Sequence, residues 1–427
     1  MHNKNSNRWY IAVMGTLLQV VLGTVYAWSF FQKPIMAEYG WTNVQTMWIF
    51  SIAILFLGLS AALGGWILPK FGPQKIATIG AILYGFGYLI SSYAMSIGSL
   101  PLFYLGFGVV GGIGLGLGYV TPVATASKWF PDKKGFITGM VVMGFGLGAL
   151  IMSKIIAPIL IKITDGNMVQ VFLFISLVLL LIGIPAGLSM KNPPVGYVPE
   201  GYIAPENKNS NQELKNELTL KQNLLSTKFV AMWLVFFLNI SAGIMFISMQ
   251  SPMMQDLLIL KNPAMNSENL ALAGASLIAI SSLFNGIGRF FWGGTSDKLG
   301  RIQVFRLILG SQIIVFILLM FTSNPYIFGA SVCFILLCYG GGFGAMPGYI
   351  LDVFQEKLMP VMYGVILTAW SFAGIVGPQV AAFIRDFYTA TPELIGSKTY
   401  LIGITLLSIG FLITLFLSNK TIISKNS

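Results

Sequence analysis

The chain has 427 residues, of which 56% are hydrophobic and only 9% are charged, and its mean hydropathy is +0.79. A soluble domain of this length does not have such a composition, whereas a polytopic helical membrane protein does. The net charge of +11 would suggest nucleic-acid binding in a soluble protein, but here the basic residues lie in short connections between apolar runs, so we expect no nucleic-acid partner.

Twelve apolar runs are long enough to cross a bilayer, and only helices satisfy their own backbone polar groups in lipid at this composition. The runs cover residues 9–32, 43–68, 76–97, 101–127, 136–160, 169–190, 229–254, 270–294, 307–323, 326–350, 361–384 and 399–418. The sequence therefore predicts an all-α membrane protein with twelve transmembrane helices, embedded in a lipid bilayer.

The basic residues alternate between the two sides of these spans. The amino terminus, the even-numbered connections and the carboxyl terminus hold eighteen of the twenty-five Lys and Arg, and the odd-numbered connections hold five. Because cytoplasmic connections are enriched in Lys and Arg, this bias places both termini in the cytoplasm and the protein in the cell (inner or plasma) membrane.

A polar, Pro-bearing stretch of mixed charge separates the sixth span from the seventh. We predict a six-helix bundle over residues 1–190, a cytoplasmic linker over 191–228 and a second six-helix bundle over 229–427. A short surface helix is expected near Asn211 to Lys221.

The two halves contain related segments. The segment Gly65–Gly72 after the second span matches Gly293–Arg301 after the eighth, 228 residues later, and Pro122 to Gly139 matches Pro347 to Gly364 with an offset of 225. Such a repeat is typical of transporters whose halves rock about a central site. It is not expected of a membrane enzyme or a single-pass receptor.

Arg289 is the one charged residue in the span from Leu270 to Trp292. A cation in hydrocarbon costs several kcal/mol unless it faces a partner or a water-filled cavity, and all fourteen Asp and Glu fall in predicted loops or interfaces. An anionic substrate would supply the missing counter-ion. The alternative is an arginine that extends to the membrane surface, since Gly293 at the cytoplasmic end is only four residues away.

The face of this helix that bears Arg289 is small or polar throughout, as expected of a helix that lines a cavity. Its members are Gly274, Ile278, Ser281 or Ser282, Asn285, Arg289 and Gly293.

Groups for enzyme chemistry are scarce. The only histidine is His2, and the two cysteines, Cys333 and Cys338, lie in one apolar run. We therefore expect no metal site, no disulfide framework and no cofactor, and with no nucleotide loop or embedded nucleophile–base pair the chain is not predicted to be an enzyme.

The loop after the eighth span has the spacing G-x-x-x-D-K-x-G-R, which resembles the signature loop of the major facilitator superfamily. Gly293 and Gly300 allow a tight turn, while Asp297 can accept a hydrogen bond from Arg301 or cap the next helix, forming a conformational latch. The alternative is an ordinary charged loop. In the first half Pro69 replaces the usual Asp, which predicts a weaker latch.

A closer resemblance covers most of the chain. The segments TVYAWSFF (24–31), GYVTPVATASKWFPDKKGFITGMVVMGFGLGA (118–149) and LFNGIGRFFWGGTSDKLGR (283–301) resemble the oxalate/formate antiporter family, which also includes bacterial monocarboxylate carriers for lactate and pyruvate. The resemblance implies the major facilitator fold, two six-helix bundles around a central cavity. It also implies that Arg289 binds the substrate, because the family places its substrate-binding arginine there.

One departure from the family bears on the substrate. The segment from Tyr363 to Trp370 resembles one in which the oxalate carrier has a lysine after a Thr-Ala pair, and here that position is Trp370. One cation favours a monocarboxylate over oxalate. Lys154 is a candidate second cation, but it lies roughly 28 Å along the fifth helix, where extension to the outer interface is expected.

Further pocket candidates are polar or aromatic residues within spans, namely Gln19, Tyr26, Trp28, Tyr119, Asn285, Tyr339 and Trp370. The aromatic ones have packing as the alternative role, and Gln19 and Asn285 have hydrogen bonding between helices. Glycines spaced by four, Gly108, Gly112 and Gly116 on the fourth helix and Gly340, Gly344 and Gly348 on the tenth, predict close approach of a neighbouring backbone.

The sequence thus predicts a secondary carrier of small organic anions, foremost monocarboxylates such as lactate, pyruvate and formate, that acts as a monomer. Anion exchange is favoured because no group that titrates near neutrality is predicted at cavity depth, and an empty cavity with an unpaired Arg289 reorients at a cost. The alternatives, in order, are proton-coupled monocarboxylate symport, oxalate/formate antiport and drug efflux. A carboxylate receptor without transport is the alternative from a different class.

Overall fold

The computed structural model describes residues 7–194, 196–199, 219–354 and 358–417. In this part of the chain all regular structure is helical, and twelve helical segments are long and apolar enough to span a membrane. The prediction of twelve spans is confirmed.

The N half comprises α1 (Arg8–Gly23), η1 (Thr24–Ala27), α2 (Trp28–Tyr39), α3 (Asn43–Phe71), α4 (Pro73–Ser96), α5 (Leu100–Phe103), η2 (Tyr104–Gly111), α6 (Gly112–Trp129), α7 (Lys134–Ile151), η3 (Met152–Ile156), α8 (Ala157–Ile163) and α9 (Met168–Leu188). The short helix α10 (Leu220–Leu224) precedes the C half. The C half comprises α11 (Thr227–Lys261), α12 (Ser267–Leu299), α13 (Arg301–Met320), α14 (Pro325–Val353), α15 (Met359–Ile366), α16 (Thr368–Phe387) and α17 (Glu393–Leu415). Several spans are assembled from consecutive helical segments, such as η3 between α7 and α8 in the fifth.

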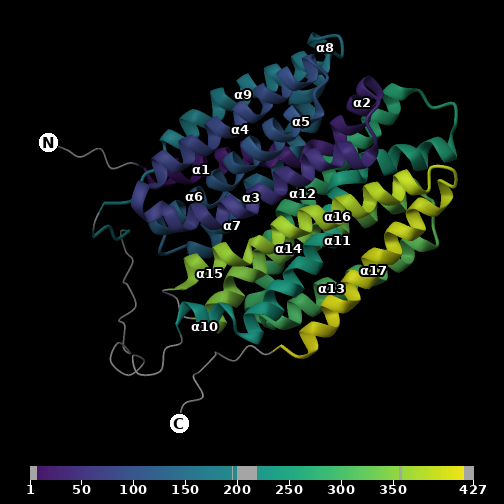
Figure 1. Ribbon diagram of the computed structural model, residues 1–427. Helices are drawn as coiled ribbons and strands as arrows, with labels where there is room; N and C mark the ends of the chain where they lie inside the picture. The colour runs from purple at the N-terminus through teal and green to yellow at the C-terminus, as the bar shows by residue number, and fades with distance from the viewer. Residues whose placement is uncertain (1–6, 195, 200–218, 355–357, 418–427) are drawn as a thin grey trace.

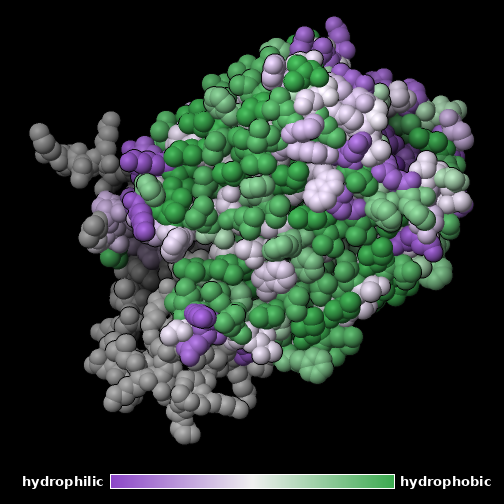
Figure 2. All heavy atoms as spheres, in the orientation of Figure 1, coloured by the Kyte–Doolittle hydropathy of each residue, from purple (hydrophilic) through white to green (hydrophobic). Residues whose placement is uncertain are grey.

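The two halves lie side by side as elongated helical bundles (Figure 1). The start of α1 and the end of α17, together with α10 and α15, lie at one end of the molecule, which we call the terminal end, and α2 and α8 extend to the opposite, far end. Hydrophobic side chains cover most of the side face in Figure 2, while hydrophilic ones gather toward the ends. Exposed Trp66, Leu181 and Ile314 belong to this apolar belt, as expected of a surface that faces lipid.

Most of the predicted linker, including nearly all of the surface helix expected at Asn211 to Lys221, lies outside the described residues. The described part shows only α10, which begins with a capping box in which Thr219 and Gln222 bond reciprocally. The predicted domain boundaries therefore remain a prediction.

The halves meet along two related crossings of helices. In one, Gly58 of α3 packs against Ser371 and Leu367, and a Cβ added to Gly58 would lie 2.8 Å from the Leu367 carbonyl oxygen. In the other, a Cβ added to Gly146 of α7 would lie 2.8 Å from the Cα of Gly286 on α12. Gly58 and Gly286 are separated by the repeat offset of 228, and Gly146 and Ser371 by that of 225. The sequence repeat thus places small residues at both crossings.

The latch predicted around Arg301 is an ion-pair cluster at the terminal end of the C half. Arg301 Nη1 lies 2.5 Å from Asp297 Oδ1, and its Nε lies 3.0 Å from Asp352 Oδ2, so the arginine joins the end of α12 to the end of α14. Gly300 turns the chain with φ +91°, and Gly72 does so with φ +78° at the equivalent point of the N half. There, Pro69 and Pro73 replace Asp297 and Arg301, and neither can form an ion pair.

Glycines of α14 allow the backbone of α12 to approach very closely. A Cβ at Gly340 would collide with the Asn285 carbonyl oxygen, and one at Gly344 would collide with that of Arg289. At Gly348 a Cβ would lie 2.5 Å from Cζ of Arg301. The prediction of close backbone approach on the tenth span is confirmed at Gly340 and Gly344, which position the part of α12 that bears Arg289, whereas Gly348 meets the Arg301 side chain.

We expect Gly344→Val to lower the thermal unfolding midpoint in detergent, because the added methyl groups force α12 and α14 apart at a cost of about 1–3 kcal/mol. Gly294→Ala is the matched control, since a Cβ there meets nothing within 4 Å. Unfolding midpoints of the two variants, followed by intrinsic fluorescence, check this. Equal midpoints for Gly344→Val and the unsubstituted protein would show that the close approach is dispensable.

Candidate functional site

Arg289 lies inside the protein, where the two halves meet. The residue is 3% exposed, and its guanidinium carbon lies 4.8 Å from the centre of the Phe343 ring and 6.0 Å from that of Phe145. Its Nη1 donates to the Tyr119 hydroxyl at 3.2 Å. The arginine thus points into the interior and does not extend to the membrane surface.

Much of the hydrogen-bonding capacity of Arg289 is unused. Its Nε and Nη2 have no hydrogen-bond partner among the described residues, and these two atoms carry three of the five N–H donors of a guanidinium. None of the ion pairs found among the described residues includes Arg289, and the described Asp and Glu lie in connections or within about two turns of a helix end. A buried cation with free donors and no carboxylate partner is built to receive an anion.

An aromatic enclosure surrounds this cation. The Trp370 ring lies 4.9 Å from Phe343, 5.2 Å from Tyr119 and 5.7 Å from Phe145, measured between ring centroids. Tyr119 and Phe145 come from the N half, whereas Phe343 and Trp370 come from the C half. The indole Nε1 of Trp370 is also buried, and its N–H meets no hydrogen-bond criterion within the described part of the chain. Electrostatic attraction between the guanidinium and an anion is strong in such a dry environment.

A pair of tyrosines joins the halves next to the enclosure. The hydroxyls of Tyr26 and Tyr339 are 2.6 Å apart, and the Tyr26 ring packs 6.3 Å from that of Trp370. Tyr26 lies on η1, the 3-10 segment that interrupts the first span. The main chain is therefore irregular at the point where the N half touches the site.

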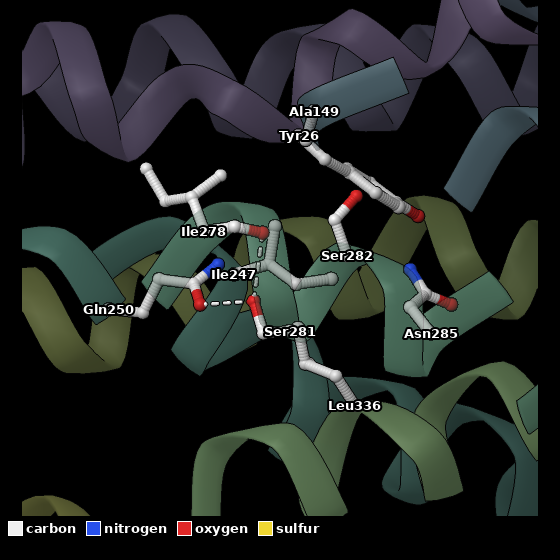
Figure 3. Close-up of a pocket in the computed structure, with 9 residues that line it drawn as sticks. All are labelled: Tyr26, Ala149, Ile247, Gln250, Ile278, Ser281, Ser282, Asn285 and Leu336. Carbon is white, nitrogen blue, oxygen red and sulfur yellow. Dashed lines mark hydrogen bonds between the residues drawn. The ribbon is translucent and has the colours of Figure 1, made fainter. Parts of the chain in front are cut away.

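A small cavity lies beyond Tyr26 (Figure 3). Its volume is ≈ 10 Å³, enough for about one water molecule. The lining residues are Tyr26, Ala149, Ile247, Gln250, Ile278, Ser281, Ser282, Asn285 and Leu336. Within it, Ser281 Oγ donates to Gln250 Oε1 at 2.6 Å, and Ser282 donates across the halves to the Gly146 carbonyl.

The structure brings together Arg289, Tyr119 and Trp370 of the predicted residues, with Tyr26 and Tyr339 beside them. Asn285 lines the adjacent cavity.

Two predicted residues lie elsewhere. Gln19 forms a hydrogen bond between helices, the role given above as the alternative to substrate binding. Its Nε2 donates to the Tyr119 carbonyl at 2.8 Å, so it supports the position of Tyr119. Trp28 packs in a separate aromatic cluster, 5.2 Å from Phe107 and 6.2 Å from Phe103.

The sequence analysis missed Phe145, Phe343 and Gln250. The two phenylalanines each lie between glycines, in GFG at 144–146 and GFG at 342–344, and this shared setting is a signal for them. No comparable signal marks Gln250. Lys154 lies apart from the site on η3, exposed, and donates to Ser276 Oγ at 2.6 Å.

Contacts between the halves close the far end of the molecule. Lys33 of α2 pairs with Asp256 of α11 at 2.9 Å. Asp386 of α16 accepts from the backbone N–H groups of Asn43 and Val44 at 3.2 and 2.9 Å, which caps the first turn of α3.

Apolar contacts close the terminal end. The Phe290 ring packs against Phe136 and leaves no room for a Cβ at Gly139, and Gly364 approaches Ala62. The arginine site is therefore enclosed from both ends.

The chain belongs to the Major Facilitator Superfamily, whose family model matches residues 13–378. It is 26% identical over 408 residues to the oxalate:formate antiporter of Oxalobacter formigenes, covering 94% of this chain and 90% of that protein. It is also similar to apicoplast pyruvate carrier 1 of Toxoplasma gondii, with 23% identity covering 82% and 79% of the two chains. The fold matches that of a solved D-xylose-proton symporter, with a TM-score of 0.71 at 14% identity over 97% of this chain and 99% of that one. The resemblance seen in the sequence motifs is confirmed.

The far-end contacts predict that Asp386→Ala opens the far end of the molecule more readily. Removing the carboxylate leaves two backbone N–H groups of α3 without their acceptor and weakens closure by about 1–3 kcal/mol. A single cysteine at buried Ser51, next to α16, should then react severalfold faster with a polar maleimide. Glu268→Ala, which removes an exposed carboxylate near the same end of the molecule, serves as control and should leave labelling unchanged. Unchanged labelling in both variants would contradict a closing role for Asp386.

Proposed function

We propose that this protein is a secondary carrier of small organic anions that binds the carboxylate of a monocarboxylate at Arg289. The observation that supports this most directly is the set of free N–H donors on a buried guanidinium without a described counter-ion. Two similar proteins are named for the transport of oxalate, formate or pyruvate, which agrees with a carboxylate substrate. A bidentate arginine–carboxylate pair satisfies both the charge and the donors.

A substrate with one negative charge suits the site better than a substrate with two. Among the described residues, the enclosure holds a single cation, Arg289. Trp370 forms an apolar wall at the position where the resemblance implies a lysine in the oxalate carrier. Lys154 is exposed and bonded to Ser276, so it adds no charge there. The second carboxylate of oxalate would remain uncompensated in a dry environment, which costs several kcal/mol.

The two halves would move by alternating access. Contacts join them at both ends, while glycines and serines allow close approach at the two crossings between. Opening the far end requires the loss of the Lys33 and Asp386 contacts, and opening the terminal end requires separation of Phe290 from Phe136. By the distribution of Lys and Arg, we place the terminal end in the cytoplasm of a plasma-membrane protein.

We further propose that the carrier exchanges one anion for another. Reorientation of the empty carrier would carry the uncompensated charge of Arg289 through an enclosed, dry state, and a bound carboxylate removes this cost. A proton-coupled carrier that relays protons through its own side chains needs a titratable carboxylate or histidine at this depth. The described residues around Arg289 include neither.

Arg289→Ala should reduce uptake of labelled lactate into proteoliposomes by about 10- to 150-fold, since a charge-assisted hydrogen bond contributes about 1.5–3 kcal/mol. Arg289→Lys should also be impaired, because an ammonium group cannot form the planar bidentate pair. Lys154→Ala is the matched control, as it removes the candidate second cation, which lies apart from the site, and it should retain uptake.

Membrane insertion and monodispersity of each variant should be verified before uptake is compared. Near-normal uptake by Arg289→Ala would contradict the proposed binding role. Loss of uptake in Lys154→Ala would show instead that the site uses a second cation.

The exchange mechanism predicts that an anion loaded inside the vesicles accelerates uptake from outside. Vesicles loaded with unlabelled lactate should take up labelled lactate at least about fivefold faster than empty vesicles, because only the loaded carrier avoids the cost of reorienting an uncompensated charge. An inward proton gradient alone should add little. Rapid concentrative uptake into empty vesicles under such a gradient would contradict exchange and establish symport, with the substrate bringing its own proton.

A further inference from the structure

Three charged residues form one cluster at the far end, and they belong to different halves of the protein. Lys33 lies on α2 of the N half, whereas Asp256 of α11 and Arg385 of α16 belong to the C half (Figure 1). Asp256 Oδ1 lies 2.9 Å from Lys33 Nζ, and its Oδ2 lies 2.7 Å from Arg385 Nη1. One carboxylate is therefore shared by two cations, one on each side of the boundary between the halves.

This sharing makes the ion pair across the boundary weaker than an isolated pair would be. Both cations contact the same carboxylate, so their separation is below the distance of about 8–10 Å over which exposed charges interact at physiological salt. The Arg385 guanidinium therefore repels the Lys33 ammonium group while both attract Asp256. The side chains of Lys33 and Asp256 are also 32% and 39% exposed, so water competes for each of them.

Opening of the far end would divide the cluster unequally. Asp256 and Arg385 remain together, because α11 and α16 belong to the same half and pack against each other, whereas Lys33 moves away with α2. The carboxylate then keeps a partner in the open state. The Nε of Arg385 has no hydrogen-bond partner among the described residues, and no other described carboxylate pairs with the side chain, so its charge acts on this cluster.

Asp386 adds a second carboxylate on the same side of the boundary, where it caps the first turn of α3. Asp256, Asp386 and Arg385 together present one net negative charge to Lys33 and to the positive N-terminal end of α3. Without the guanidinium, the C half would present two negative charges there. The attraction that closes the far end would then be stronger.

We propose that Arg385 regulates closure of the far end by competing with Lys33 for Asp256, so that the closed state is only slightly favoured. A small change in the relative stability of two conformations shifts their populations severalfold, so this competition sets how often the far end opens. The inference rests on the alternating access proposed above and adds a device that regulates it.

Cysteine labelling tests the competition. A single cysteine at Ser51, with Cys333 and Cys338 replaced by alanine, reacts with a polar maleimide when the far end opens, because Ser51 is buried between the halves. Lys33→Gln should accelerate labelling about two- to fivefold, the factor that one partly exposed ion pair contributes. Arg385→Gln should slow labelling by a similar factor. Removal of either cation from the same carboxylate thus has opposite effects.

The double variant Lys33→Gln/Arg385→Gln separates competition from a merely structural role of the arginine. Once Lys33 is absent, the guanidinium has no competitor, so the double variant should label at a rate close to that of Lys33→Gln alone. Arg385→Lys guards against misfolding, since a lysine keeps the charge that a single contact to Asp256 requires. It should label at a rate close to that of the unsubstituted carrier.

The matched controls are Lys162→Gln in α8 and Lys398→Gln in α17. Each removes an exposed cation near the same end of the molecule, and neither lysine forms an ion pair within the described part of the chain. Both controls should leave the labelling rate unchanged.

Unchanged or faster labelling of Arg385→Gln overturns the competition, as does equal slowing by this substitution with and without Lys33. Labelling does not require transport, so either result leaves the proposed anion binding at Arg289 standing. Near-normal uptake by Arg289→Ala would overturn the proposed binding role without altering the expected labelling rates.

Discussion

The organisation of this protein depends on one unsatisfied charge. Burying the guanidinium of Arg289 costs free energy, and the Phe343 ring and the Tyr119 hydroxyl offset only part of that cost. The surrounding structure fixes the group nonetheless, because Gly340 and Gly344 of α14 admit the backbone of α12 at the turn that bears it. A side chain held this firmly would be preorganised for the proposed anion, so little further ordering would be required on binding.

The internal repeat explains how such a site can be exposed to either side in turn. Equivalent positions of the two halves, Gly58 with Gly286 and Gly146 with Ser371, bring small residues to both crossings between the bundles. Glycines let the backbones approach closely there, and side chains such as Ile54 and Met143 also reach across the two crossings. The ends differ from the crossings, because ion pairs and a helix cap hold the far end and aromatic packing holds the terminal end. In a carrier of this design, the contacts at the ends set the relative stability of the two openings.

Features encoded locally were predictable from the sequence. The spans follow from long apolar runs, and the exceptional position of Arg289 follows from the absence of acidic residues in spans. The glycine stripe of α14 follows from its spacing of four. The choice among aromatic residues did not follow, because Trp28 and Tyr26 are two residues apart on the first span and yet lie in different clusters. Residues two apart on a helix face different directions, and the apolar first span does not indicate which of the two faces the site. Gln250 was not predicted for a related reason, since the contact that places it at the cavity is with Ser281 on another helix.

Trp370 shows how a substitution can change selectivity without disturbing the fold. A lysine at this position, as the resemblance to the oxalate carrier implies for that protein, would add a second cation to the space that Trp370 now fills with an indole ring packed on Tyr119, Phe145 and Phe343. The ring excludes water and so strengthens the interaction between Arg289 and one carboxylate, while it removes the compensation that a second carboxylate requires. The neutral wall of the neighbouring cavity has the same consequence, since it provides hydrogen bonds but no charge. Under the proposed function, selection at this site would therefore operate by matching the number of charges.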